Sequence, residues 1–186
     1  MGGKLTTCRS LAEESAEVIL GALGRERTED SRQRYLPGGV GYPETEEDLN
    51  ARVRTMADRW NVDIRVVTYL WHILGTRSEE ALEAIGVPKR EMLAGTDIPR
   101  AFVRWIVDHE WVGRLEDLVE RRLMLLFDRD LRPETLEDLA AILAEAGKLP
   151  VAQRSAEAKA YQRRLERYFG RRLAGGGLVS PPPAGR

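Results

Sequence analysis

The chain has 186 residues, with 29 Lys and Arg against 30 Asp and Glu, so its length suits one ordinary domain and its charge is balanced. Balanced charge gives no global attraction for nucleic acid, although a local basic patch stays open. One cysteine excludes an internal disulfide, and with only two histidines it is too few for the familiar zinc spacings. We therefore expect a globular, cytoplasmic protein with no nucleic-acid partner and no metal site.

Nearly every segment repeats its apolar residues at helical spacing, and no stretch alternates as a half-buried strand does. The first helix is predicted over about residues 7–23, with Gly24 placed to end it. Its expected inner face consists of Leu11, Ser15, Val18, Ile19 and Ala22. Residues 25–43 then form a linker that contains the loop LPGG at 36–39.

Three helices are predicted next. Thr45 with Asp48 resembles a capping box and starts a helix with the stripe Leu49, Val53 and Met56. Asp63 is the expected cap of the following helix, and Thr76 with Glu79 has the spacing of a capping box for a short one that ends near Gly86. The inner face expected for the helix after Asp63 is Ile64, Val67, Leu70, Trp71 and Leu74.

Residues 87–98 are expected to be a connector, and Pro99 suits a first helical position. A long periodic stretch then runs to Phe127 with a predicted break at Gly113, and Pro133 opens a helix through Ala146. The last helix is predicted over 152–173, with inner positions at Ala156, Ala160, Leu165 and Tyr168. Residues 174–186 are expected to be a disordered tail. The predicted fold class is all-α, an irregular bundle of six to eight helices.

The most informative short motif is GGKLTT at residues 2–7. Glycines let backbone amides approach an anion, Lys4 adds a charge, and a helix N-terminus follows. The motif lacks the spacing of the known phosphate-binding loops. On these grounds alone a flexible start with a threonine-capped helix is the favoured interpretation.

The surrounding residues add a resemblance. GGKLTTCRSLAEES resembles the motif that ends the flavin domain of FAD-dependent glycerol-3-phosphate dehydrogenases and alpha-glycerophosphate oxidases. The loop LPGG, the segment LGTRSEEAL at 74–82 and HEWVGRLEDLVERRLMLLF at 109–127 resemble further motifs of this family in the same order. The similarity covers about residues 2–170, although Cys8, Leu123 and Met124 depart from the family pattern.

The resemblance implies a division of the chain. Residues 1–24 would be the end of a flavin domain, 25–43 a linker, 44–173 the helical C-terminal domain and 174–186 the tail. It also implies FAD as cofactor, with Gly3, Lys4, Leu5 and Thr6 in contact with the flavin and Lys4 also in reach of substrate. The implied reaction is oxidation of glycerol 3-phosphate to dihydroxyacetone phosphate, and no catalytic residue is assigned within this chain.

The sequence contains no dinucleotide-binding GxGxxG unit. We therefore expect it to be incomplete and inactive alone, with a missing or separately encoded flavin domain as its partner. The alternative is a non-catalytic helical interaction module derived from the same domain. Peripheral membrane association, at the inner face of the membrane, is a further expectation that the resemblance leaves open.

Other polar groups are expected to have structural roles. His109 with Glu110, and His72, are interpreted as helix-surface or packed residues. The charges Arg114, Glu116, Asp117, Glu120, Arg121 and Arg122 are interpreted as a solvated face with pairs such as Asp117 with Arg121, and a docking surface is the alternative. The run RRLERYFGRR at 163–172 interleaves arginines with aromatic rings, and is interpreted as a solvated helix end. Contact with RNA or with an anionic membrane surface is the alternative.

Overall fold

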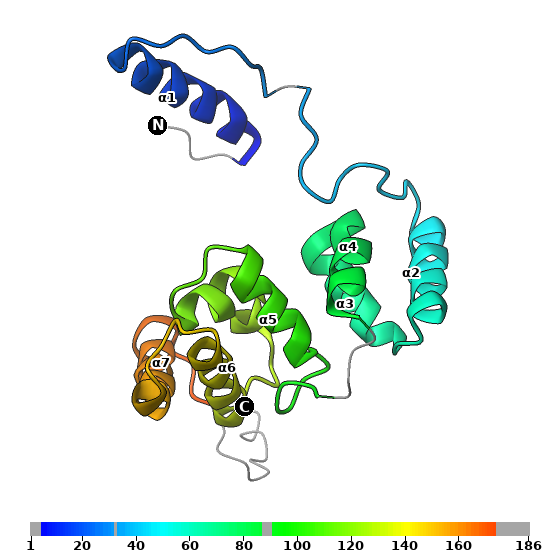
Figure 1. Cartoon of the computed structure of the whole chain (residues 1–186), viewed down its shortest axis with the longest axis vertical. Helices are drawn as coiled ribbons and strands as arrows, with labels where there is room; N and C mark the ends of the chain where they lie inside the picture. The colour runs from blue at the N-terminus through cyan, green and yellow to red at the C-terminus, as the bar shows by residue number, and fades with distance from the viewer. Residues whose placement is uncertain (1–4, 32, 87–90, 174–186) are drawn as a thin grey trace, which may run out of the picture. The chain divides into compact units, whose positions relative to one another are not determined.

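The computed structural model describes residues 5–31, 33–86 and 91–173. Within these ranges it contains seven α-helices and no strand, which confirms the all-α prediction (Figure 1). The chain divides into two compact units, one up to Val40 and one from Gly41. The helices are α1 Cys8–Ala22, α2 Glu46–Trp60, α3 Ile64–Leu74, α4 Ser78–Ile85, α5 Arg100–His109, α6 Pro133–Glu145 and α7 Arg154–Phe169. The predicted tail at 174–186 lies outside the described residues.

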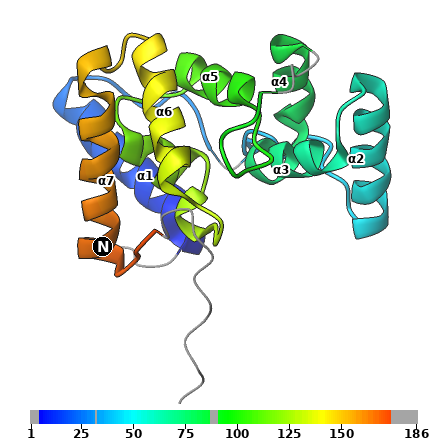
Figure 2. The same cartoon turned by 90° about the horizontal axis from the view of Figure 1, so that it is seen from below.

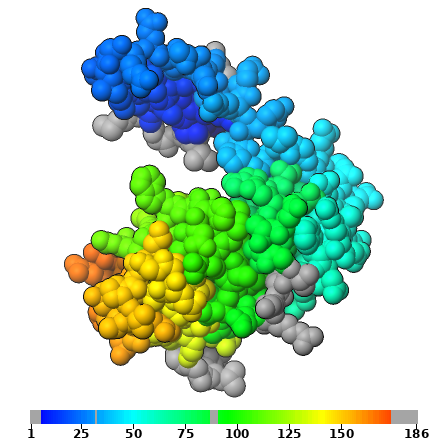
Figure 3. Space-filling model, viewed as in Figure 1, coloured from blue at the N-terminus to red at the C-terminus, as the bar shows by residue number. Residues whose placement is uncertain are grey.

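In the larger unit, helices that follow one another in sequence also pack against one another. Helix α2 contacts α3, α4 contacts both α3 and α5, and α6 contacts both α5 and α7. Figure 2 shows this succession from α2 at one end to α7 at the other. The space-filling view shows the side chains of these helices closing into a continuous body (Figure 3).

The starts of α2 and α3 follow from their caps. Thr45 Oγ1 accepts a hydrogen bond from the Asp48 amide (3.1 Å), and Asp63 Oδ1 accepts one from the Arg65 amide (2.8 Å). Each bond satisfies a backbone N–H that has no partner inside the helix. Asn61 follows the end of helix α2, and its φ of 49° is in the left-handed region that asparagine tolerates.

A single apolar core runs through the larger unit. The predicted stripes are confirmed at Val53 and Met56 of α2, and at Val67, Leu70, Trp71 and Leu74 of α3, all of which are buried. Ile64 is instead 44% exposed, so its assignment to the inner face was wrong. It is the first residue of α3, and Val66 fills the buried position.

Helix α4 begins one residue later than the Thr76 capping box predicts. Residues Gly75–Arg77 form a 3₁₀ turn, and the buried Ser78 donates its hydroxyl hydrogen bond to the Gly75 carbonyl (2.7 Å). The contact of Ser78 with the preceding turn replaces the predicted Thr76–Glu79 cap. The predicted end is confirmed, since Gly86 follows Ile85 with a φ of 72°.

The long periodic stretch after Pro99 is interrupted, as predicted, but over a wider region than Gly113. Helix α5 ends at His109, and a π-helix occupies Asp117–Arg122, closed by a hydrogen bond from the Leu123 amide to the Leu118 carbonyl (2.8 Å). Such widened turns accommodate an extra residue and frequently occur at functional sites. A 3₁₀ turn at Leu125–Phe127 follows.

Helix α6 confirms the start predicted at Pro133, but the face predicted for α7 was largely wrong. Ala156, Ala160 and Tyr168 are exposed, and the buried positions are Ala158, Tyr161 and Leu165. Only Leu165 was placed correctly. The alanine-rich sequence has few large apolar side chains that could fix which face turns inward.

Candidate functional site

The predicted flavin-contacting turn lies at the start of the smaller unit. Leu5–Thr7 form a 3₁₀ turn that leads directly into α1, and Thr6 is exposed. Gly3 and Lys4 lie outside the described residues. The first turn of α1 carries no acidic side chain, so the positive end of its dipole is not neutralised within the helix. This helix end can therefore interact favourably with a negatively charged group of a ligand.

Helix α1 is held to the segment after it by polar contacts. Glu13 accepts hydrogen bonds from both the amide (3.0 Å) and the hydroxyl of Ser31, and Arg9 donates to the Ser31 carbonyl (2.8 Å). Arg27 pairs with Glu17 at 3.0 Å and with Glu13 at 3.5 Å. The hydrogen bonds from Ser31 hold the pKa of the Glu13 carboxyl below its ordinary value.

The apolar face predicted for α1 is present but is not buried. No residue of this helix is buried, and Val18 is 74% exposed. Ile19 and Leu23 are exposed as well. A helix gains most of its stability in a protein from packing its apolar face, so this face is a candidate contact surface.

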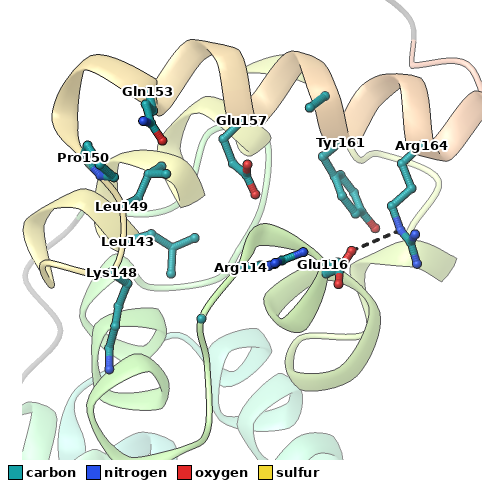
Figure 4. Close-up of a pocket in the computed structure, with 12 residues that line it drawn as sticks. Arg114, Glu116, Leu143, Lys148, Leu149, Pro150, Gln153, Glu157, Tyr161 and Arg164 are labelled. Atoms are coloured by element: carbon teal, nitrogen blue, oxygen red, sulfur yellow. Dashed lines mark ion pairs between the residues drawn. The ribbon is translucent and has the colours of Figure 1, made fainter.

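The larger unit contains a charged pocket of about 460 Å³ between α7 and the segment that enters the π-helix (Figure 4). From α7, the side chains of Glu157, Tyr161 and Arg164 point toward this segment, where Arg114 and Glu116 lie. The pocket also has an apolar part. It is lined by Leu143, Leu149, Pro150 and Ala160.

Arg164 organises the charges of this pocket. Its guanidinium donates to both oxygens of Glu120, at 2.8 and 3.3 Å, and lies 3.5 Å from Glu116. The Tyr161 hydroxyl donates to the same Glu120 carboxylate at 3.2 Å. These contacts tie α7 to the π-helix through a two-point arginine–carboxylate pair.

The electrostatics of the pocket follow from these contacts. The hydrogen bonds from Arg164 are the largest cause of the lowered pKa of Glu120, and the charge of Arg164 adds to it. Burial, followed by the charge of Glu120, raises the pKa of Tyr161, which stays protonated as a donor. For Asp117, burial alone would raise the pKa, but the amides of Gly113 and Arg114 and the charge of Arg121 lower it. Arg164, Glu120 and Asp117 are therefore charges that neighbouring groups already satisfy.

The other polar candidates take structural positions. His109 stacks on Trp105, with ring centroids 4.7 Å apart, and its Nδ1 lies 2.9 Å from the Trp105 carbonyl oxygen. The neighbouring Glu110 pairs with Arg122 at 3.6 Å. The predicted pair of Asp117 with Arg121 is present, and His72 and Cys8 are exposed.

The four tryptophans differ from one another. Trp71 and Trp105 are buried in the core, and Trp60 packs against it. Trp111 is instead 93% exposed, although tryptophan side chains are on average highly buried.

The sequence reasoning missed the part of the pocket that α7 supplies. Glu157 and Tyr161 were not singled out, and Arg164 was considered only as part of the run at 163–172, although their spacing of four and three places them on one helix face. Their partners Glu116 and Glu120 have the same helical spacing. The two segments are joined across more than forty residues of sequence, so only their complementary charges could have indicated the pairing.

Two site types have no candidate in the described part of the chain. No group of three or more His, Cys, Asp or Glu side chains is arranged to hold a metal ion there. Among the same residues, no helix is long and apolar enough to cross a bilayer.

Comparison with known proteins assigns most of the helical part of the chain to a protein family. Residues 30–154 match the family model of the C-terminal domain of alpha-glycerophosphate oxidase, which is about two thirds of the 186 residues. A search of the curated proteins gives no match. Residues 2–7, with the GGKLTT motif, precede the matched region, so their assignment to a flavin site stays a prediction. This protein belongs to the family defined by the C-terminal domain of alpha-glycerophosphate oxidase.

Proposed function

We propose that this protein supplies the helical domain of a FAD-dependent enzyme that oxidises glycerol 3-phosphate to dihydroxyacetone phosphate. The observation that carries the proposal is the family match over residues 30–154. The family belongs to the flavoprotein oxidases, which implies FAD. FAD, when bound, supplies the hydride acceptor for the reaction.

The start of α1 supports the proposed contact with one edge of a flavin. The start of α1 offers backbone amides, the exposed Thr6 hydroxyl and no acidic side chain in its first turn. These groups would donate to the ring edge where negative charge gathers. The resemblance also implies that Lys4, which lies outside the described residues, is in reach of substrate. No strand is present among the described residues to form a dinucleotide-binding unit, so a flavin-binding domain must supply the rest of the site.

The exposed face of α1 supports such a partner. Val18 and Ile19 near the end of α1, and Leu23 directly after it, are exposed apolar side chains on the element that follows the proposed flavin-contacting turn. A flavin-binding domain that covered these side chains would bury apolar area and fix the helix N-terminus beside the ring. The proposed partner surface and the proposed flavin edge thus belong to one element.

The test combines the full chain with the flavin-binding domain of an enzyme of this family that has been separated from its own helical domain. The chain alone should bind no stoichiometric FAD and reduce no dye with glycerol 3-phosphate. The mixture should form a complex and recover substrate-dependent dye reduction. Stoichiometric FAD binding with dye reduction by the chain alone would contradict the proposed division of the site.

Two variants, each with a matched control, separate complex formation from enzymatic activity. Val18→Asp should weaken the complex, whereas Val151→Asp, at a valine of similar exposure on the larger unit, should not. Lys4→Ala should leave the complex intact and lower activity, whereas Lys159→Ala, at an exposed lysine of α7, should leave both unchanged. A complex that forms without any turnover would instead support the non-catalytic interaction module.

A further inference from the structure

Two charged side chains in the pocket beside α7 have almost no partner among the described residues. The Arg114 guanidinium makes no ion pair or hydrogen bond there, since only the backbone amide of Arg114 is bonded. The half-buried Glu157 carboxylate accepts a single long hydrogen bond, from the Leu115 amide at 3.5 Å. Of the other cations in the lining, Arg164 is held by two carboxylates, and the Lys148 amine points away from Glu157 in Figure 4. The pocket therefore offers an unpaired cation and a nearly unpaired carboxylate.

The space beside these charges is partly apolar, and it stays open because two residues of its walls are small. Leu143 and Leu149 line it, and the Glu157 carboxylate points into the same region from α7 (Figure 4). Gly113 has no side chain and Ala160 has only a methyl group, so neither fills the volume of about 460 Å³. Pockets for small ligands usually have volumes of about 300–1,000 Å³, so this one has room for a small organic molecule.

The wall formed by α7 is held in place by two arginines. Arg164 ties the middle of the helix to the Glu120 carboxylate of the π-helix at 2.8 Å. Past the end of α7, the Arg171 guanidinium donates hydrogen bonds to the carbonyls of the turn at 125–128, namely those of Leu125, Leu126 and Asp128. A ligand that contacts Glu157 therefore meets a wall whose position is already fixed, which lowers the entropic cost of binding.

We propose that this pocket binds a free amino acid with an apolar side chain. The ligand carboxylate pairs with the Arg114 guanidinium, and the ligand ammonium group donates to the Glu157 carboxylate. The apolar side chain lies against Leu143 and Leu149. A zwitterion satisfies both charges of the pocket at once, whereas a simple anion or cation leaves one of them without a partner. A peptide end carries only one of these charges, so the pair of groups selects the free amino acid.

The test is isothermal titration calorimetry of the full chain with leucine and with two analogues that each lack one charge. Isocaproate is leucine without its ammonium group, and isoamylamine is leucine without its carboxylate. Leucine should bind, and each analogue should bind roughly tenfold or more weakly, because a hydrogen bond between charged groups is lost. Glycine, which has no side chain to place in the apolar part of the pocket, should also bind more weakly than leucine.

Variants at the two charges separate their roles. Arg114→Gln should weaken leucine binding but leave isoamylamine binding unchanged, because this analogue has no carboxylate. Glu157→Gln should weaken leucine binding but leave isocaproate binding unchanged, because this analogue has no ammonium group. The matched controls should keep the wild-type affinity for leucine. They are Arg54→Gln, at an exposed arginine of α2, and Glu134→Gln, in the first turn of α6 as Glu157 is in the first turn of α7.

A variant that fills the pocket tests its location. Ala160→Leu should abolish leucine binding, whereas Ala156→Leu, at an exposed alanine of α7 outside the pocket lining, should not. Circular dichroism of each variant separates a lost site from a lost fold.

Three outcomes would overturn the proposal: no binding of leucine to the wild type, equal affinity for leucine and either analogue, or unchanged leucine binding in Ala160→Leu. The measurement needs neither FAD nor a flavin-binding domain, so its outcome is independent of the proposed enzyme function.

Discussion

The two units of this chain stabilise their helices in different ways. Residues from Gly41 onward surround an apolar core in which Phe102, Leu136 and Leu139 have no exposed surface. In the smaller unit, α1 has no buried residue and is tied to Ser31 and Arg27 by polar contacts. Exposed ion pairs and hydrogen bonds contribute little to stability, whereas buried apolar area contributes most of it. Helical sequence alone therefore does not reveal which helix can remain folded without a partner.

The largest expected difference is in backbone hydrogen exchange. Amides of α6, which packs against both α5 and α7, should exchange only on global unfolding, while those of α1 should exchange by local opening. The two sets should differ by roughly a thousandfold or more in protection. Mass spectrometry of the exchanging chain checks this, and comparable protection in α1 and α6 would show that α1 is packed in solution.

The next largest expected effect is the loss of unfolding free energy when a core side chain is truncated. Phe102→Ala should lower the free energy of unfolding by about 3–5 kcal/mol, because it removes a ring that packs against Tyr69 and Trp105. Val18→Ala on α1 should change it by less than about 0.5 kcal/mol. Urea unfolding followed by circular dichroism measures both, and similar losses would contradict the contrast between the units.

Removal of a hydroxyl group should also change the free energy of unfolding more in the larger unit than in the smaller one, but by less than core truncation. The buried Thr135 donates to the Ala94 carbonyl (2.7 Å) and accepts from the Arg132 amide (3.3 Å). Thr135→Ala should cost about 1–3 kcal/mol, because it leaves buried backbone groups without partners. Among the described residues, the Ser15 hydroxyl on α1 donates only to the Leu11 carbonyl of its own helix. Ser15→Ala should therefore be near neutral in the same urea measurement.

The smallest expected effect is on the pH dependence of stability. Arg164 lowers the folded-state pKa of Glu120 below its ordinary value of 4.5, so ionised Glu120 stabilises the fold above that value. This contribution is lost as the pH falls through the lower folded-state pKa. Unfolding curves of the wild type and Glu120→Gln should therefore converge on acidification. Glu13→Gln, which changes a similarly lowered pKa in the smaller unit, should leave core unfolding unaltered at every pH.

The sequence predicted local features better than long-range ones. Thr45 and Asp63 cap their helices as expected, because capping depends on residues only two or three positions away. The start of α4 was missed because Ser78 bonds back to Gly75 and forms a tighter turn. The face of α7 was missed because alanines at 156, 158 and 160 fit either side of a helix and the deciding contacts come from distant residues.

The candidate site shows the same limit. The motif at residues 2–7 could be singled out from its composition, but the charged pocket depends on Arg164 reaching Glu120 across 44 positions. The π-helix that positions Glu120 has no sequence signal distinct from an ordinary amphipathic helix. Pairing of distant charges therefore had to be observed in the folded chain.

The three carbonyl contacts of Arg171 have a practical consequence for any shortened version of this protein. A chain that stopped before this position would leave the Leu125, Leu126 and Asp128 oxygens without their guanidinium donor, and the turn would lose its tie to α7. Expression designs should therefore keep at least Arg171 at the C-terminal side, even though α7 itself ends at Phe169. The helix boundary and the boundary of the stable domain are two different residues.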